Sequence, residues 1–519
     1  MPRAPGTRFG LLAVSSFLVP AALTVATSAR ALEPEITGDA VGQFYDVRSP
    51  TGQTILERRR LTATLGLSGY EILKPDPKDR NSPDIIFRAR LRYDADYGSN
   101  SAEANLGHAQ SGQLFVPGFS QGPVDLMYAY LEGRRFLHGT TGWKLGRQYQ
   151  TDVLGWWSFD GGEFKVTTPF YVQVEGYGGL EQRGGLPLST SRYESDGIWR
   201  GNRSGFDPSL YPQFQPANLA PAFGVALDSA GPTWIHGRFV YRRVYNTGSV
   251  GTSDFASGLY APTVLDTTRI SSDRMGYALD VDLGKFAGLK GGLIYDFYNT
   301  EVTSIFASID GYVARPLTLS LDYDYYLPVF DADSIWNIFA GDPMNDIGAR
   351  ASVTPNDRLS FSGGGHVRVY NVNTTPNDQS DSSPNVSPAV AAQAALGYPT
   401  NGHPFDGGGS LGARYKWGQG NVNLRGAADF GQDGERVGGD VAGEDLLDSR
   451  YVLRARVGVW QWDDKLRPDR DATNFGYVLG VGYRFAPRCQ AVFEWEHDIN
   501  RLVGQRFRTM INVSVAVMP

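Results

Sequence analysis

Apolar and polar residues alternate with a period of two along most of this 519-residue chain. The clearest case is residues 85–97, where Ile85, Phe87 and every second residue after them are apolar or aromatic. The residues between them, after Ile86, are Arg, Arg, Arg, Asp and Asp. Because successive side chains of a β-strand point to opposite faces, we predict a strand with one apolar and one charged face.

The same alternation recurs to the end of the chain. It is found in residues 61–67, 317–326, 411–417, 422–430, 451–457, 477–485 and 507–517. The apolar rows commonly end in Tyr, Phe or Trp, which prefer the level of the lipid headgroups. A soluble β-sandwich also alternates, but its inner face favours Val, Ile and Leu without such aromatic ends. The pattern therefore predicts an all-β, transmembrane, antiparallel up-and-down β-barrel, with lipid outside and water inside.

The lengths of the connections predict how the strands are joined. Long connections lie near residues 100–122, 184–221, 246–272 and 371–404, and short turns separate most other strands. Because outer-membrane barrels have short periplasmic turns and long extracellular loops, we expect the N-terminus in the periplasm. The up-down alternation fails near residues 432–448, and an odd number of strand-like segments results. We expect about 18 strands, within a range of 16 to 22, and a short helix at residues 386–396.

The first 31 residues have the features of a secretory signal peptide. Arg3 and Arg8 precede a mostly apolar, uncharged stretch, and residues 29–31 (Ala-Arg-Ala) fit a cleavage site. We expect cleavage after Ala31 and one barrel domain over residues 32–519, with no plug. Removing 31 of 519 residues leaves 488, and the loss of three arginines changes the formal net charge from −7 to −10.

The composition argues against several classes of protein. No stretch after residue 31 approaches the ~20 apolar residues of a membrane helix, and the mean hydropathy is −0.29. Cys489 is the only cysteine, which excludes an internal disulfide and a cysteine-based metal site. The acidic surplus argues against nucleic acid as a partner.

Charged residues at inward-facing positions form the candidate functional surface. By strand parity we place in the lumen Arg88, Arg90, Arg92, Asp94, Asp96, Arg238, Arg242, Asp322, Asp324, Arg368, Arg414, Lys416, Arg454 and Arg456. Basic side chains in a narrow aqueous lumen favour anions, because the field is focused there. Arg88, Arg90 and Arg92 are the best candidates for selectivity, since three like charges at alternate positions repel each other. The alternative is that arginine and aspartate rows only pair across strands and stiffen the wall.

A second motif spans residues 145–162. It reads Leu-Gly-Arg-Gln at 145–148, then Asp152, then Gly-Trp-Trp-Ser-Phe-Asp-Gly-Gly at 155–162. A Gly-Arg-Gln strand followed by a loop ending in Phe-Asp-Gly resembles outer-membrane porins of Gram-negative bacteria, over about 25 residues. The resemblance implies that Arg147, Asp152 and Asp160 lie near a constriction of the pore. The alternative is an ordinary hairpin with aromatic residues at the membrane interface.

The chain departs from the common porins at its end, which is Met518 and Pro519 rather than an aromatic residue. Its size is similar to that of exopolysaccharide-export barrels of the alginate type, which have about eighteen strands, a charged lumen and no plug. That similarity is architectural only. Tyr326, Tyr370 and Trp460 fall on the inward parity, where rings can stack on the faces of sugars.

The sequence therefore predicts a channel in the outer membrane of a Gram-negative bacterium for hydrophilic solutes, anionic or glycan. Two roles remain open. One is the terminal barrel of an exopolysaccharide export route, which the length of the chain favours. The other is a general diffusion porin for the uptake of small solutes. Expected partners are membrane lipid, the solute or polysaccharide, the barrel-assembly machinery and, for export, a periplasmic component.

An enzyme is not expected. A lipase would need its catalytic groups on the lipid face, but His236 and His366 fall on the inward parity. No phosphate-binding glycine loop precedes a helix, so nucleotide chemistry is not expected either. We expect no cofactor and no metal, because the acidic runs at residues 160–163 and 463–471 fit solvated turns better than calcium loops.

Overall fold

The computed structural model describes most of the expected barrel. The described residues are 33–73, 76, 78–79, 81–96, 124–182, 220–247, 250–254, 259–265, 268–314, 316–329, 343–373, 401–402, 405–431, 434–465, 469 and 471–517. The expected signal peptide at residues 1–31 and the expected helix at residues 386–396 lie outside them.

One antiparallel sheet contains almost all of the regular structure. Its strands are β1 (Glu33–Arg48), β2 (Thr54–Tyr70), β3 (Asp84–Asp96), β4 (Val124–Arg135), β5 (Thr141–Asp152), β6 (Gly155–Thr167), β7 (Val172–Glu181), β8 (Pro221–Ser229), β9 (Ile235–Asn246), β12 (Arg269–Asp282), β13 (Ala287–Asp296), β14 (Glu301–Ala314), β15 (Leu317–Tyr326), β16 (Met344–Asn356), β17 (Leu359–Tyr370), β20 (Phe405–Trp417), β21 (Gly420–Phe430), β22 (Gly434–Leu447), β23 (Tyr451–Asp464), β24 (Ala472–Ala486), β25 (Cys489–Asn500) and β26 (Gly504–Val517).

The remaining elements are small. Two short hairpins, β10 (Val250–Asp254) with β11 (Leu259–Leu265) and β18 (Val372–Asn373) with β19 (Asn401–Gly402), lie in the connections β9–β12 and β17–β20. The four-residue α3 (Phe136–Gly139) forms the turn between β4 and β5. Among the described helices there is none with the length and apolarity of a membrane span.

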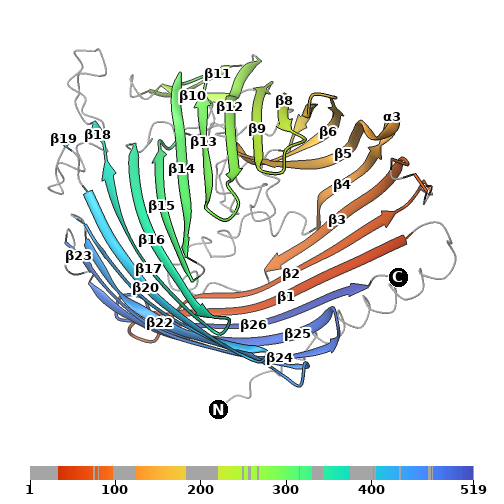
Figure 1. Ribbon diagram of the computed structural model, residues 1–519. Helices are drawn as coiled ribbons and strands as arrows, with labels where there is room; N and C mark the ends of the chain where they lie inside the picture. Colours follow the sequence, from red (N-terminus) through yellow and green to blue (C-terminus); the bar gives the residue numbers. More distant parts are fainter. Residues whose placement is uncertain are drawn as a thin grey trace, which may run out of the picture.

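The sheet closes on itself. Each strand pairs antiparallel with its neighbours in the chain, and β1 pairs with both β2 and β26. The result is a ring in chain order with no free edge among its 22 strands (Figure 1). Closure satisfies the backbone donors and acceptors between the strands, which a lipid environment requires.

The barrel has 22 strands rather than about 18, and 22 is the upper limit of the predicted range of 16 to 22. Residues 432–448, where the up-down alternation seemed to fail, contain β22, which pairs with β21 and β23 along its length. Its positions alternate between Val437, Val441 and Leu447 on the exposed face and small or charged residues on the other. Because Gly and acidic residues interrupt the apolar row, the segment reads like a loop in the sequence.

The connections differ between the two ends of the ring. The start of β1 and the end of β26 lie at the same end, as an even strand number requires. All connections longer than 15 residues (97–123, 182–220, 247–268, 327–343 and 371–404) leave the opposite end. Short turns at the end that carries the termini place that end in the periplasm.

The outer face of the ring is apolar, and the inner face is polar. On β20, Phe405 and Leu411 are 62% and 74% exposed, and the same parity continues to Tyr415 and Trp417 near the strand end. Among the described residues, few apolar side chains are buried: six of them form one cluster on and beside β6 to β9, and the others are scattered over the ring rather than forming a layer through the molecule. An exposed apolar exterior around a polar interior is the arrangement of a barrel in lipid.

Candidate functional site

A column of arginines lies on the inner face of β3. Arg88, Arg90 and Arg92 share this face, opposite the exposed Phe87 and Leu91. The Arg90 guanidinium donates from Nη2 to Asp39 Oδ2 at 2.9 Å and to Thr64 Oγ1 at 2.8 Å. The column therefore presents three guanidinium groups on the inner face, and that of Arg90 is paired with Asp39 of β1.

Aromatic and acidic residues also lie beside this column. The guanidinium carbon of Arg88 lies 5.7 Å from the centre of the Tyr70 ring. Asp94 and Asp96 continue β3 in register with Thr62 and Arg60 of β2, and their side chains lie outside the described part of the structure.

An acidic wall faces the arginine column across the ring. Asp322 and Asp324 lie on β15, and Asp346 lies on β16. Arg350 is 2.9 Å from Asp322, and Arg368 is 2.8 Å from Asp346, whereas Asp324 has no ion pair within the described residues. β3 and β16 are the third and fourteenth of 22 strands, so they lie on opposite sides of the ring.

The basic residues of β20 to β23 differ in their pairing. Arg454 lies between Glu444 at 2.8 Å and Glu494 at 3.2 Å, and Arg456 is 3.2 Å from Asp440. Arg414 and Lys416 are exposed on the inner face of β20, without an ion pair to any described residue. This part of the wall thus combines a paired network with two accessible cations.

The hairpin of β5 and β6 leaves the wall and turns into the bore. Pairing between β4 and β5 ends at Ala129 and Arg147, although β5 continues to Asp152. The bend follows glycines that are neighbours in register: Gly146 opposite Gly161, and Gly161 opposite Gly179. A Cβ on any of these three would come closer than 3.0 Å to a backbone oxygen of the adjacent strand. We call this line of three glycines the crease.

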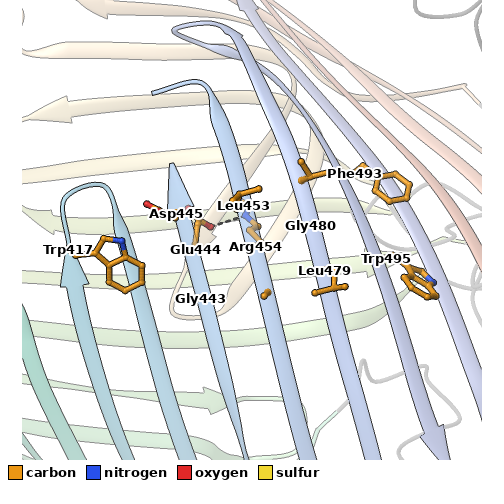
Figure 2. Close-up of a pocket in the computed structure, with 12 residues that line it drawn as sticks. Trp417, Gly443, Glu444, Asp445, Leu453, Arg454, Leu479, Gly480, Phe493 and Trp495 are labelled. Atoms are coloured by element: carbon orange, nitrogen blue, oxygen red, sulfur yellow. Dashed lines mark hydrogen bonds and ion pairs between the residues drawn. The ribbon is translucent and has the colours of Figure 1, made fainter. Parts of the chain in front are cut away.

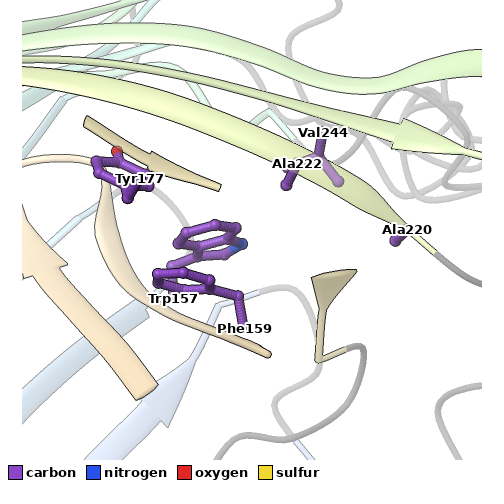
Figure 3. Packing of buried hydrophobic residues seen from close by; sticks show 6 residues of the cluster. All are labelled: Trp157, Phe159, Tyr177, Ala220, Ala222 and Val244. Carbon is purple, nitrogen blue, oxygen red and sulfur yellow. The ribbon is translucent and has the colours of Figure 1, made fainter. Parts of the chain in front are cut away.

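One face of the hairpin packs against the inner wall. Trp157 and Phe159 stack with ring centres 4.3 Å apart, and Tyr177 of β7 lies 5.6 Å from the Trp157 ring. Ala222 of β8 and Val244 of β9 belong to the same buried cluster (Figure 3). Because Phe159 is fully buried, this cluster fills part of the space inside the ring.

The tip of the hairpin reaches β12. A Cβ on Gly276 of β12 would come closer than 3.0 Å to Val153 and would touch Leu154 at 3.0 Å. The hairpin therefore spans the inner faces of β7, β8 and β9, and β5 runs toward β12 within the ring (Figure 1). This crossing narrows the bore on one side.

The opposite face of the hairpin is directed toward the open part of the bore. Arg147 and Asp160 form a two-point ion pair on it, with distances of 2.8 and 2.9 Å. Tyr149 and Trp156 stack on the same face with ring centres 6.2 Å apart. Arg147 and Asp160 have the parity of the lipid-facing Leu145, but the bend at the crease turns them inward.

Two residues of the expected site are buried between the hairpin and the wall, and a third is paired within the wall. The side chain of Asp152 is 0% exposed and that of Arg242 is 9% exposed. Arg238 is bonded to Glu175 and Asp228 on β7 and β8. Strand parity predicts Arg238 and Arg242 in the lumen, and the porin resemblance predicts Asp152 near the constriction, but Asp152 and Arg242 are buried where the hairpin packs against the wall.

A buried ion network on this wall was not expected from the sequence. The side chain of Glu163 is fully buried between Lys144 at 3.1 Å and Lys165 at 2.9 Å, and Gln150 donates to it at 2.6 Å. Lys144, Glu163 and Lys165 are visible in the sequence as charges at alternate strand positions. The strand register that brings them together is not.

The calcium and hydrolase alternatives do not match the geometry. Asp160 and Glu163 lie on opposite faces of β6 and pair with Arg147 and Lys144. In the described part of the chain, no group of three or more His, Cys, Asp or Glu is arranged to hold a metal ion. Residues 408–412 fit the pattern Gly-x-Ser-x-Gly, but they lie inside β20 rather than at a strand-to-helix turn.

A groove on the exterior is separate from the bore. It lies between Trp417 and Trp495, over β22 to β25, and Leu453, Leu479 and Phe493 contribute to its lining (Figure 2). These side chains have the parity of the exposed apolar face. The groove therefore faces lipid and is not part of a solute path.

A closed ring with an apolar exterior and a charged, narrowed interior is the architecture of a β-barrel that spans a membrane. The chain is such a barrel, with 22 strands. No protein-family model matches the chain, and no curated protein matches it.

Several solved structures match nearly the whole chain at low sequence identity. OccAB4 of Acinetobacter baumannii is 10% identical, with 94% of this chain and 98% of that chain covered and a TM-score of 0.40. OccK3 (OpdO) of Pseudomonas aeruginosa is 8% identical, with 94% and 96% covered and a TM-score of 0.39. OpdK of Pseudomonas aeruginosa with vanillate is 9% identical, with 93% and 99% covered and a TM-score of 0.37.

Proposed function

We propose that this barrel is a diffusion channel for the uptake of small hydrophilic solutes, with a preference for anions. The observation that carries the proposal is the column of Arg88, Arg90 and Arg92 on the inner face of β3. Guanidinium groups remain charged at all physiological pH values. Inside a narrowed bore they raise the local concentration of anions and lower that of cations.

The acidic wall supports the same function. Asp322, Asp324 and Asp346 lie across the ring from the arginine column, and two of them are paired with arginines of β16 and β17. Because two arginines neutralise two of these three aspartates, the wall carries a small net negative charge opposite β3, and this charge difference orients a solute that carries a dipole. The negative end of the solute then follows β3 through the bore.

The geometry favours small solutes over a polymer. The hairpin of β5 and β6 crosses the inner faces of three strands and packs there through Trp157 and Phe159. A polysaccharide would have to pass this narrowing as an extended chain. We therefore adopt the uptake role and do not propose exopolysaccharide export, for which no described feature provides support.

Ion selectivity in planar bilayers tests the proposal. The triple variant Arg88→Gln, Arg90→Gln and Arg92→Gln is expected to shift the reversal potential in a salt gradient toward cation preference. The matched control replaces Arg358, Arg450 and Arg488 with Gln, which changes the net charge equally but in periplasmic turns. The control is expected to remain close to wild type.

Two results would contradict the proposal. If folded wild-type protein, identified by its heat-modifiable mobility, shows no conductance, the barrel is not an open channel. If the channel conducts but the triple variant and the control have the same selectivity, the arginine column does not select the solute.

A further inference from the structure

We propose that Arg242 and Gly276 are positioning residues that set the width of the bore by holding the tip of the β5–β6 hairpin. The inference rests on the proposed channel function. It assigns to Arg242 a role different from contact with the solute, because only 9% of its side chain is exposed.

Arg242 of β9 contacts three groups of the hairpin. Its Nη1 lies 3.9 Å from Asp152 Oδ2, and its Nη2 donates to the Leu154 carbonyl at 3.4 Å. Its guanidinium carbon lies 5.0 Å from the centre of the Trp157 ring. One side chain of the barrel wall thus engages the end of β5, the turn and the start of β6.

Gly276 of β12 provides the space for the turn. Val153 and Leu154 lie so close to its backbone that a Cβ would overlap Val153. Any side chain at position 276 would therefore push the turn away from the wall. Arg242 and Gly276 together determine how far the tip extends over the inner face.

The hairpin can move without breaking the barrel. Beyond Arg147, β5 has no partner on its β4 side, and β6 is paired with β7 only as far as Phe159. The residues at the tip, 153–157, are therefore held by Arg242, the Gly276 contact, the aromatic cluster and the hydrogen bond from Trp157 Nε1 to Glu181 Oε1 at 2.8 Å. Displacement of these residues would leave the ring of 22 strands paired.

Two variants release the tip in independent ways. The first combines Arg242→Gln with Asp152→Asn, so that no lone charge is left in a buried position. The second is Gly276→Val, with Gly288→Val on the neighbouring strand as its control. A Cβ on Gly288 would meet only the Tyr312 hydroxyl at 3.5 Å, which is ordinary contact.

Both release variants are expected to have a higher single-channel conductance than wild type and to admit larger neutral polymers. Their anion selectivity is expected to stay the same, because Arg88, Arg90 and Arg92 are unchanged. A general loss of structure would instead alter selectivity and heat-modifiable mobility together. Gly288→Val is expected to conduct as wild type.

A reversible cross-link gives the decisive test. Val153→Cys and Gly276→Cys, in a Cys489→Ser background, place two thiols within the reach of a disulfide. Because a side chain at position 276 displaces the turn, the reduced double-cysteine channel is expected to conduct more than wild type, and oxidation is expected to lower its conductance to the wild-type value. In the Arg242→Gln, Asp152→Asn background, oxidation is expected to restore wild-type conductance, and a reductant is expected to raise it again.

The outcomes separate this inference from the proposed function. If wild type conducts and both release variants have the same conductance as wild type, the inference fails, because the hairpin then stays in place without Arg242 and Gly276. If oxidation does not restore the released channel, the inference also fails. If folded wild type does not conduct at all, the proposed function fails instead.

Discussion

At the scale of single residues, charges on the inner face have two different roles. Arg90 and Arg242 share the same inward parity, but the Arg90 side chain is 30% exposed, whereas that of Arg242 is 9% exposed beneath the hairpin. Exposure separates solute-facing residues from structural ones. Parity predicts which face of a strand a side chain occupies, but not what covers that face.

Glu163 is expected to be a major contributor to stability. In Glu163→Gln, two lysines lose the carboxylate that they share, so we expect a destabilisation of about 3 kcal/mol. The loss of the compact band with increasing urea, followed by gel mobility, measures it.

The exposed pair of Glu435 and Lys465, at 2.9 Å, provides the matched control. Glu435→Gln is expected to change stability by less than about 1 kcal/mol, because water screens the pair. Equal losses in the two variants would show that the buried network does not stabilise the barrel.

At the scale of elements, the crease converts part of the wall into a constriction. The resemblance of residues 145–162 to porins predicted that Arg147, Asp152 and Asp160 lie near a constriction of the pore. The structure brings Arg147 and Asp160 together on the face toward the bore and buries Asp152 on the other. The glycines are visible in the sequence, but their alignment depends on the register of three strands.

Gly161→Ala is expected to disrupt the bend. Its Cβ would overlap the Gly178 carbonyl oxygen, where a backbone shift is needed, so we expect a loss of about 2–4 kcal/mol or failure to assemble. Gly176→Ala on β7 is the control, because nothing lies within 4 Å of its Cβ. Urea titration measures the difference in stability between the two variants. Similar unfolding midpoints would contradict the close backbone contact at Gly161.

At the scale of the whole molecule, the ring sets the electrostatics of the bore. The arginine column and the acidic wall lie on opposite strands only because the sheet closes with 22 strands. With 18 strands, the same residues would face different partners. The long-range arrangement of charge is thus a property of the closed ring.

Anion selectivity is expected to fall as salt rises. The Debye length is about 10 Å at 0.1 M and about 3 Å at 1 M, so concentrated salt screens the arginine column from the centre of the bore. Reversal potentials measured at the same concentration ratio, but at low and high total salt, test this. A permeability ratio that does not change would point to contact with the solute rather than to a long-range field.

The alternation of residues was sufficient for the fold class, the lipid-facing face and the end from which the long connections leave, because these depend on local parity and chain order. It did not predict β22, the 22-strand closure, or the turn of β5 and β6 into the bore. Those features depend on contacts between distant segments: Gly146 with Gly161 and Gly179, and Val153 with Gly276. A strand's own sequence specifies its two faces, whereas its neighbours decide whether it stays in the wall.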